Sequence, residues 1–91
     1  MSVYVDSGKW KLGRMKMAHM LADTPEELFD MADRLGLKRE WFQSRSVPHF
    51  DICQSKRVLA ISYGAISISN HDMVAVIRRL RDRPNLQKAV S

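Results

Sequence analysis

Apolar and polar positions follow two periodicities along this 91-residue chain. Period-2 alternation predicts extended segments at residues 2–6 and 65–69. Short aromatic or β-branched pieces at 40–43 and 49–52 are also expected to be extended, and residues 18–22 are a plausible second strand. Apolar residues every three or four positions predict three helices, at residues 25–35, 54–63 and 70–83. The stretch 9–16 is basic and contains glycine, and we expect it to be a loop.

The helix at 25–35 has the clearest signals at its ends. Thr24 suits the N-cap, Pro25 suits the first helical position, and Glu27 completes a capping box. Gly36 is placed to end the helix in a left-handed conformation, with Leu37 after it as an apolar contact.

The order of elements indicates a fold class. Extended segments that alternate with helices predict a small α/β sandwich of order β-β-α-β-α-β-α, with a short mixed sheet covered by about three helices. We see no internal repeat and no domain boundary. The prediction is therefore one domain over residues 1–84, with a poorly anchored tail at 85–91.

Composition narrows the class of protein. A hydrophobic share of 45% and a charged share of 27% are ordinary for a soluble domain, and no apolar run approaches the ~18 residues of a membrane helix. The first residues lack the order of a signal peptide, and the single Cys53 has no internal disulfide partner. We expect a cytoplasmic protein without a membrane partner.

Positive charge is concentrated in two stretches. The net charge of +5 comes largely from residues 9–16 and 78–83, whereas acidic residues gather over 26–33. Such a surface favours an anionic partner, which could be a nucleic acid, a phosphorylated metabolite or an acidic protein. The alternative is a solvated basic surface without a partner.

The segment PHFDICQSKR concentrates residues that carry chemistry. If HFDI is extended, His49 and Asp51 share one face while Phe50 and Ile52 point to the core. A histidine beside a carboxylate can act as a general base with its orienting partner, or as two metal ligands. The alternative is a hydrogen bond that fixes a loop.

Two cations follow at the predicted start of the second helix. Lys56 and Arg57 would lie in its first turn, where free N–H groups and added positive charge can bind an anion. Lys9, Trp10 and Lys11 could close over the same anion, with the indole stacked on a base. The alternative is that these side chains only reach water or pack on the core.

Two more polar residues extend the candidate site. Asp6 follows the first strand, where α/β sheets place ligands, and His19 lies in the second. Together with His49 and Asp51 they would make a divalent-metal or acid–base set. The sequence does not show whether the four side chains converge.

Several blocks resemble one family in order and spacing. They are YVD, HMLADTPEELFDMADRLGLKREWFQ, PHFDI, KR and GA, spread over Val3 to Ala65. The chain resembles a small family from bacteria and their phages, catalogued as domain of unknown function 4031. The resemblance implies a stand-alone domain of this size and no particular activity.

Three functional hypotheses follow. The first is a small domain that binds a phosphate-bearing ligand, a nucleotide or a nucleic acid, through Lys56 and Arg57, with His49 and Asp51 orienting it. The second is a metal-assisted phosphodiesterase or nuclease that uses Asp6, His49 and Asp51. The third is a phage-encoded inhibitor or adaptor that binds a host protein through the basic stretches 9–16 and 78–83.

Overall fold

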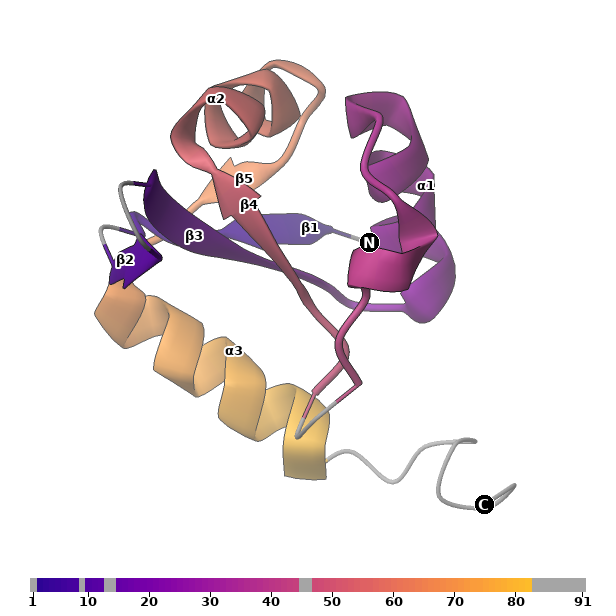
Figure 1. Ribbon diagram of the computed structural model, residues 1–91. Helices are drawn as coiled ribbons and strands as arrows, with labels where there is room; N and C mark the ends of the chain where they lie inside the picture. Colours follow the sequence, from indigo (N-terminus) through magenta and orange to yellow (C-terminus); the bar gives the residue numbers. More distant parts are fainter. Residues whose placement is uncertain (1, 9, 13–14, 45–46, 83–91) are drawn as a thin grey trace.

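In the computed structural model, the described residues are 2–8, 10–12, 15–44 and 47–82, and they form a sheet with helices on both faces (Figure 1). The strands are β1 (Val3–Val5), β2 (Trp10–Leu12), β3 (Met15–Ala22), β4 (Phe50–Cys53) and β5 (Ile66–Ser67). The helices are α1 (Pro25–Leu35), the 3₁₀ turn η1 (Arg39–Trp41), α2 (Gln54–Ser62) and α3 (Asn70–Asp82). This confirms the predicted small α/β fold with a mixed sheet and three α-helices.

The long strand β3 is the centre of the sheet. β1 and β2 both pair with it in antiparallel fashion, β1 through Val3↔Ala22 to Val5↔Met20 and β2 through Trp10↔Met17 to Leu12↔Met15. β4 pairs with β3 from Met17↔Cys53 to Met20↔Phe50, and the short β5 is parallel to β1. Strands that are distant in sequence therefore meet across β3.

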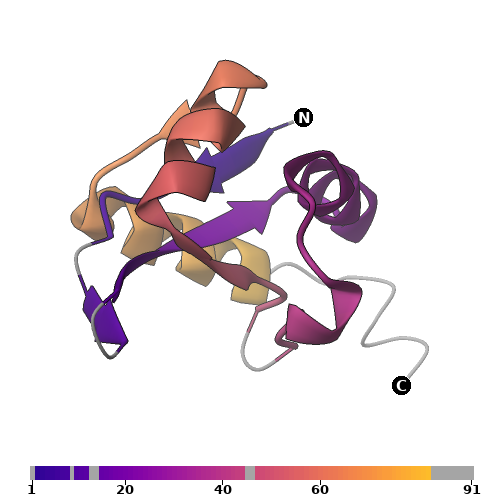
Figure 2. The same cartoon turned by 45° about the horizontal axis from the view of Figure 1, so that its top comes forward.

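The two faces of the sheet carry separate apolar clusters. α1 and α2 cover one face, and α3 lies on the other (Figures 1 and 2). The larger cluster includes Val5, Ala18, Met20, Phe50 and Ile52, all at most 1% exposed. The smaller cluster joins strand and helix residues on the α3 side, among them Tyr4, Leu21, Met73 and Val76. Alternation along each strand separates the two sets.

The ends of α1 confirm the sequence prediction. Thr24 Oγ1 accepts from the Glu27 N–H at 3.3 Å, which is the N-cap half of a capping box, and the Thr24 hydroxyl donates to Glu27 Oε1 at 2.9 Å. Gly36 has φ +75°, and the Leu37 N–H donates to the Ala32 carbonyl at 2.9 Å. The helix ends in the left-handed turn that its glycine predicts.

The prediction of a basic loop at 9–16 is wrong. Residues 10–12 form β2, and β3 begins at Met15 rather than at Ala18, so most of this stretch is paired strand. The segment KWKLGRMKM alternates cations with apolar residues, which is a strand pattern. Its density of lysine and glycine hid that signal.

The prediction of an extended piece at 40–43 is also wrong for its first half. Residues Arg39–Trp41 form η1, and the chain is extended from Phe42 onward, with Gln43 in an isolated antiparallel bridge to His49. Phe42, just after the turn, packs in a tilted arrangement against Phe29 and Phe50, at ring-centroid distances of 4.8 and 5.7 Å. This aromatic packing accompanies the local bend.

Candidate functional site

Three neighbouring strands place a row of polar side chains on the α3 face of the sheet. Asp6 follows β1 directly, His19 lies in β3, and Asp51 in β4 is the register partner of His19. The alternate positions Val5, Ala18 and Ile52 belong to the core beneath α1 and α2, so the row points to the opposite face. His49, two residues before Asp51, joins the row from the start of this strand region.

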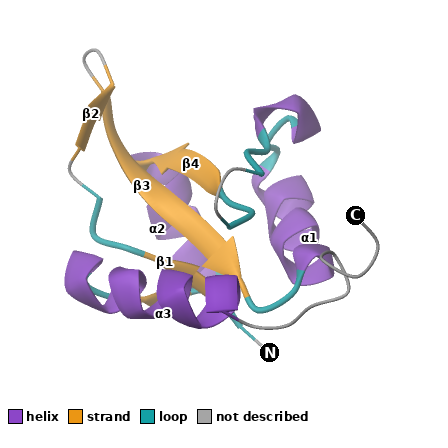
Figure 3. Cartoon of the chain, turned by 90° about the horizontal axis from the view of Figure 1, so that it is seen from below, coloured by secondary structure: helices purple, strands orange, loops and turns teal. Residues whose placement is uncertain are grey.

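Part of the α3 face is left open. In Figure 3, which looks at the molecule from the α3 side, α3 lies beside β1 while β3 remains in view. The side chains of His19, His49 and Asp51 keep 23%, 17% and 31% of their surface exposed. Asp6, at 3%, is the buried end of the row.

Asp6 and His19 form a tightly coupled pair. One carboxylate oxygen of Asp6 accepts the backbone N–H of His19 at 2.9 Å, and the other lies 2.7 Å from His19 Nδ1. The Asp6 N–H in turn donates to the His19 carbonyl at 3.2 Å. Three contacts therefore fix the imidazole against a buried carboxylate, and its Nε2 faces along the row.

Asp51 links the two histidines. Its Oδ1 lies 3.7 Å from His49 Nε2 and 4.0 Å from His19 Nε2, and the two imidazole rings meet edge to face with centroids 5.7 Å apart. Its Oδ2 accepts a hydrogen bond from Gln43 Nε2 at 2.7 Å. The four residues that the sequence singled out for a joint metal or acid–base set do converge. We refer to Asp6, His19, His49 and Asp51 below as the polar row.

One buried atom of the polar row has no hydrogen-bond donor among the residues that the structure describes. Asp51 Oδ1 is enclosed and accepts no hydrogen bond from this part of the chain, whereas Asp51 Oδ2 accepts one from Gln43. A buried acceptor without a donor loses solvation and gains nothing in return, so native structures rarely contain one without a reason.

Lys56 and Arg57 do not converge on one point. Lys56 Nζ donates to the Leu35 carbonyl at 2.7 Å and so caps the end of α1. Arg57 Nε donates to the Asp6 carbonyl at 2.7 Å, and its Nη2 donates to Ser67 Oγ at 2.7 Å. Both cations stabilise contacts between elements, and Arg57 lies beside the buried end of the polar row.

Of the other basic residues predicted for an anion site, Lys9 lies outside the described residues. Trp10 and Lys11 belong to β2, and only their backbone is described. On α3, Arg79 donates to Asp23 Oδ1 at 3.0 Å and to the Tyr4 hydroxyl at 3.1 Å, which ties this helix to the sheet. Arg78 and Arg81 are exposed.

Cys53 stands at the N-cap of α2, directly after β4. Its Sγ lies 3.2 Å from Ser55 Oγ. This hydrogen bond, together with backbone N–H groups of the first turn and against a smaller effect of burial, lowers the pKa of the Cys53 thiol.

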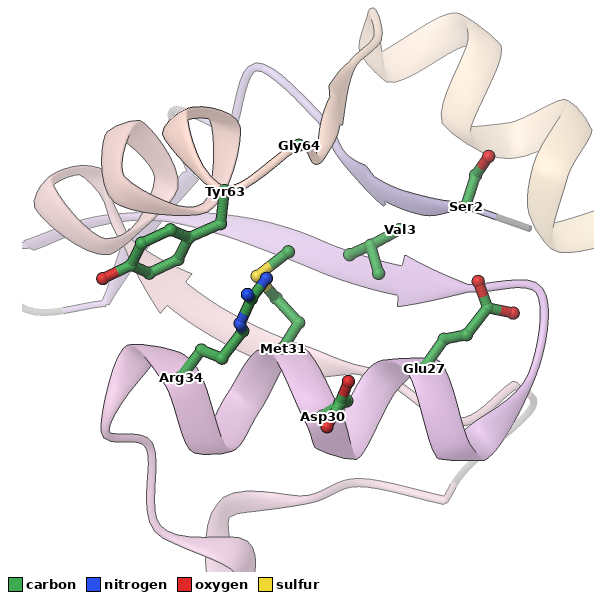
Figure 4. A pocket seen from close by; sticks show the side chains of 8 residues that line it. All are labelled: Ser2, Val3, Glu27, Asp30, Met31, Arg34, Tyr63 and Gly64. Carbon is green, nitrogen blue, oxygen red and sulfur yellow. The ribbon is translucent and has the colours of Figure 1, made fainter.

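A separate pocket lies on the α1 and α2 side of the molecule. It encloses about 210 Å³ and is lined by Ser2, Val3, Glu27, Asp30, Met31, Arg34, Tyr63 and Gly64 (Figure 4). The Arg34 guanidinium lies 5.3 Å from the centroid of the Tyr63 ring. No residue of the polar row lines this pocket, and the chemistry that the sequence predicts is not found there.

Sequence reasoning did not identify the groups that orient the polar row. Val47 contributes its carbonyl, which lies 2.9 Å from His49 Nδ1, and a backbone acceptor leaves no mark in the sequence. Gln43 reaches Asp51 because it forms an isolated bridge with His49, and nothing in the local sequence pattern indicates that bridge. The helical period of 3.6 residues and the strand period of 2 residues indicate neither the Val47–His49 contact nor the Gln43–Asp51 contact.

Comparison with known families gives a clear assignment. The model of the family described as "Protein of unknown function (DUF4031)" matches residues 3–80, and the chain belongs to this family. Every residue of the polar row falls within that match. No curated protein and no solved structure matches the chain. Within the described residues, every helix is too short or too polar to cross a membrane.

Proposed function

We propose that this protein hydrolyses phosphate esters, in a nucleotide or a nucleic acid, at the polar row. The observation that carries the proposal is the convergence of two imidazoles and two carboxylates, from three paired strands, on a partly open face of the sheet. Such a group can accept and deliver protons next to a bound substrate, which is what hydrolysis requires.

The Asp6–His19 pair supports an acid–base role. A buried carboxylate that binds Nδ1 fixes the tautomer and the orientation of an imidazole and directs Nε2 to the reacting group. Here the 2.7 Å contact to Nδ1 and the 2.9 Å contact to the backbone N–H hold both. His49, with Nδ1 facing the Val47 carbonyl, presents its Nε2 to the same region.

Positive charge supports an anionic substrate. The chain carries +5 overall, and the Arg57 guanidinium flanks the buried end of the polar row through its contact with the Asp6 carbonyl. A net positive surface raises the local concentration of phosphate-bearing molecules. These two features favour a phosphate ester over a neutral or cationic substrate.

Simple ligand binding is the nearest alternative, and the geometry favours it less. Binding through a Lys56–Arg57 clamp would use two cations that already donate to carbonyl and hydroxyl oxygens of the fold. A binding domain also has no need for an Asp–His pair beside a second imidazole. A hydrolase and a ligand-binding domain can be told apart because only the hydrolase converts its substrate to product.

The test is a hydrolysis assay with bis-(p-nitrophenyl) phosphate and with short RNA and DNA oligonucleotides, each with and without added divalent metal ions. We expect turnover that falls at least 100-fold in His49→Asn. The asparagine amide can still donate to the Val47 carbonyl, so the fold should be kept while Nε2 is removed. His71→Ala, an exposed histidine on α3, is the matched control and should keep full activity.

Absence of turnover with all substrates and metals would contradict the proposal. Equal turnover in His49→Asn and in the unmodified protein would show that the activity belongs to another site or to a contaminant. Tight binding of an oligonucleotide without cleavage would favour the binding-domain alternative.

A further inference from the structure

Three atoms of the polar row can only accept hydrogen bonds when both histidine rings are neutral. They are His19 Nε2, His49 Nε2 and Asp51 Oδ1. The carbonyl of Val47 is an acceptor, so the proton of a neutral His49 ring is on Nδ1 and Nε2 carries a lone pair. The Asp6 carboxylate likewise places the proton of a neutral His19 ring on Nδ1. Both Nε2 atoms lie within 4.0 Å of Asp51 Oδ1, which also carries lone pairs.

Lone pairs that face one another repel, and a cation among them removes the repulsion. Asp51 Oδ1 is buried and accepts no hydrogen bond, so it has not found a donor within the described fold. The Nδ1 atom of each ring faces an oxygen acceptor, which is the Asp6 carboxylate for His19 and the Val47 carbonyl for His49. This is the pattern that metal-binding histidines show in proteins, where a carboxylate or carbonyl on the far nitrogen orients the ring.

We propose that the polar row binds one divalent transition-metal ion of the zinc type. Its ligands are His19 Nε2, His49 Nε2 and Asp51 Oδ1, and at least one position stays open for water or substrate. Two imidazole nitrogens and one carboxylate oxygen suit zinc, cobalt or iron rather than magnesium or calcium, which prefer all-oxygen sites.

This assignment gives Asp6 another role from the one that the sequence suggests. Asp6 binds Nδ1 of His19 and the His19 N–H, so it orients a ligand and does not contact the metal itself. Gln43 does the same for Asp51 through the 2.7 Å bond to Oδ2, and the Val47 carbonyl does so for His49. Each proposed ligand is therefore oriented by a hydrogen-bond partner on its side away from the metal.

Metal binding requires the ligands to approach one another. Ligands about 2.0–2.1 Å from a tetrahedral zinc ion lie roughly 3.3 Å apart. The separations here are 3.7 and 4.0 Å, and among residues 2–8, 10–12, 15–44 and 47–82 no group of three or more His, Cys, Asp or Glu side chains is already arranged to hold a metal ion. Binding a metal ion would therefore require the two partly exposed imidazoles and the Asp51 carboxylate to rotate toward one another.

The inference does not depend on the proposed function, but it changes the role of the two Nε2 atoms. A nitrogen that binds a metal ion cannot also transfer a proton, so in the metal-bound protein the base would be a water molecule in the open position. Metal binding can be measured without a substrate, so the metal site and the proposed function can fail separately. A bound cation would also offset the two carboxylates, which would otherwise repel a phosphate ester.

The test uses untagged full-length protein freed of metal with EDTA and then dialysed. Titration with Co²⁺ should produce visible d–d absorption that saturates at one ion per chain, and Zn²⁺ should displace it. Calorimetric titration with Zn²⁺ should give the same stoichiometry. The unmodified protein and each variant below are checked for folding by circular dichroism.

Four variants distinguish a metal site from non-specific binding. Loss of a ligand in His49→Asn or Asp51→Asn should lower Zn²⁺ affinity at least 100-fold, and Asp6→Asn, which changes only the group behind His19, should lower it about 10–100-fold. His71→Ala should leave affinity unchanged.

Three outcomes would overturn the inference: no saturable Co²⁺ signal with the unmodified protein, undiminished Zn²⁺ affinity in folded His49→Asn and Asp51→Asn, or an equal loss in His71→Ala. Saturable binding without hydrolysis would support the metal site and contradict the proposed function. Hydrolysis by a protein that binds no metal would contradict the metal site and support the proposed function.

Discussion

At the scale of single residues, the two oxygens of Asp51 have different surroundings. Oδ2 accepts a hydrogen bond from Gln43, while Oδ1 is buried beside two imidazoles and has no donor within the described residues. The strands fix this arrangement, because Asp51 is the register partner of His19 and its neighbours Phe50 and Ile52 are locked in the core. The polar row is therefore held in a state that costs stability in the absence of a cation.

This cost can be measured with Asp51→Asn in the presence of EDTA. The amide oxygen can keep the bond from Gln43, and the amide N–H₂ replaces Oδ1 and donates to His49 Nε2. Satisfying the buried position should add about 1 kcal/mol to the free energy of unfolding. The melting temperature should then rise by about 4–8 °C for a domain of this size. A fall in melting temperature would mean that Oδ1 already has a favourable partner.

The thiol of Cys53 offers a second test at this scale. The Ser55 hydroxyl stabilises the thiolate, so Ser55→Ala should raise the pKa of Cys53. Because only the thiolate reacts with iodoacetamide, the pH profile of alkylation should shift to higher pH in this variant. Ser62→Ala, at the other end of α2, is the control and should leave the profile in place. An unchanged profile in Ser55→Ala would show that the helix N–H groups act alone.

At the scale of elements, the chain must bend between β1 and β2 to follow one edge of β3. Gly8 makes this bend with φ +73°, and a Cβ there would lie 2.5 Å from the Met17 carbonyl oxygen and 2.9 Å from Ala18 Cβ. Asn70 fixes the bend from the start of α3, with Ser7 Oγ 3.0 Å from its Oδ1 and the Gly8 carbonyl 3.4 Å from its Nδ2. Asp6 thus stands beside His19 because only glycine fits two positions later.

Substitution of Gly8 should therefore be costly. Gly8→Ala combines a left-handed backbone with a backbone clash, and we expect a loss of at least about 1–3 kcal/mol in unfolding free energy. Gly64→Ala is the matched control, because Gly64 also has positive φ but nothing lies within 4 Å of its added Cβ. Urea denaturation of both variants gives the comparison. If the two losses are equal, the clash at Gly8 relaxes and the bend is not as tight as described.

The start of α1 gives a smaller effect of predictable size. Thr24→Ala removes the acceptor for the Glu27 N–H and the partner of its carboxylate. The expected loss is about 1 kcal/mol, or about 4–8 °C in melting temperature. Thr24→Ser keeps the hydroxyl and should lie within a few tenths of a kcal/mol of the unmodified protein. A neutral Thr24→Ala would show that α1 is held by packing alone.

The sequence predicted some elements much better than others. α1 and α2 were predicted within one residue at each end. Thr24 and Gly36 cap the two ends of α1, and Gly64 follows soon after the end of α2, although Cys53 at its start makes no side-chain capping bond. The 9–16 stretch was not, since a strand there depends on pairing with a segment that the local pattern does not name. β5 is only two residues long and exists through its contact with β1.

The candidate site shows the same limit. Residue types and two-residue spacing identified His49 and Asp51, but their union with Asp6 and His19 depends on the register of three strands. Lys56 and Arg57 illustrate the opposite case, because two cations in a helix start suggested a ligand and the fold uses both for its own carbonyl groups. The sequence indicated which residues could carry chemistry, but it did not indicate which strands pair in the folded protein.

At the scale of the whole molecule, all the apolar packing described lies between Val3 and Leu80. The larger cluster joins α1 and α2 to the sheet, and the smaller joins α3 to the other face. The family match covers the same span, residues 3–80. The sequence prediction of one domain over residues 1–84 stays a prediction, because the described residues end at 82.

A shortened chain tests that boundary. If residues 85–91 form the poorly anchored tail that the sequence predicts, a protein that ends after residue 84 should unfold within about 2 °C of the full chain, because a change that removes no packing or capping usually costs less than about 0.5 kcal/mol. Thermal denaturation followed by circular dichroism at 222 nm, a standard helix wavelength, provides the measurement. A drop of more than about 8 °C would show that residues 85–91 contribute to the fold.

Because β3 is the centre of the sheet, the polar row and the hydrophobic core depend on the same strand register. Each strand around it alternates strictly, so a slip of one residue between β3 and β4 would turn His19 or Asp51 inward and bring Ala18 or Ile52 to the surface. A mutation that moved the polar row would thus break the hydrophobic packing at the same time. The register that buries the core therefore also fixes the polar row, and its chemistry can be changed without loss of packing only by replacing its side chains in place.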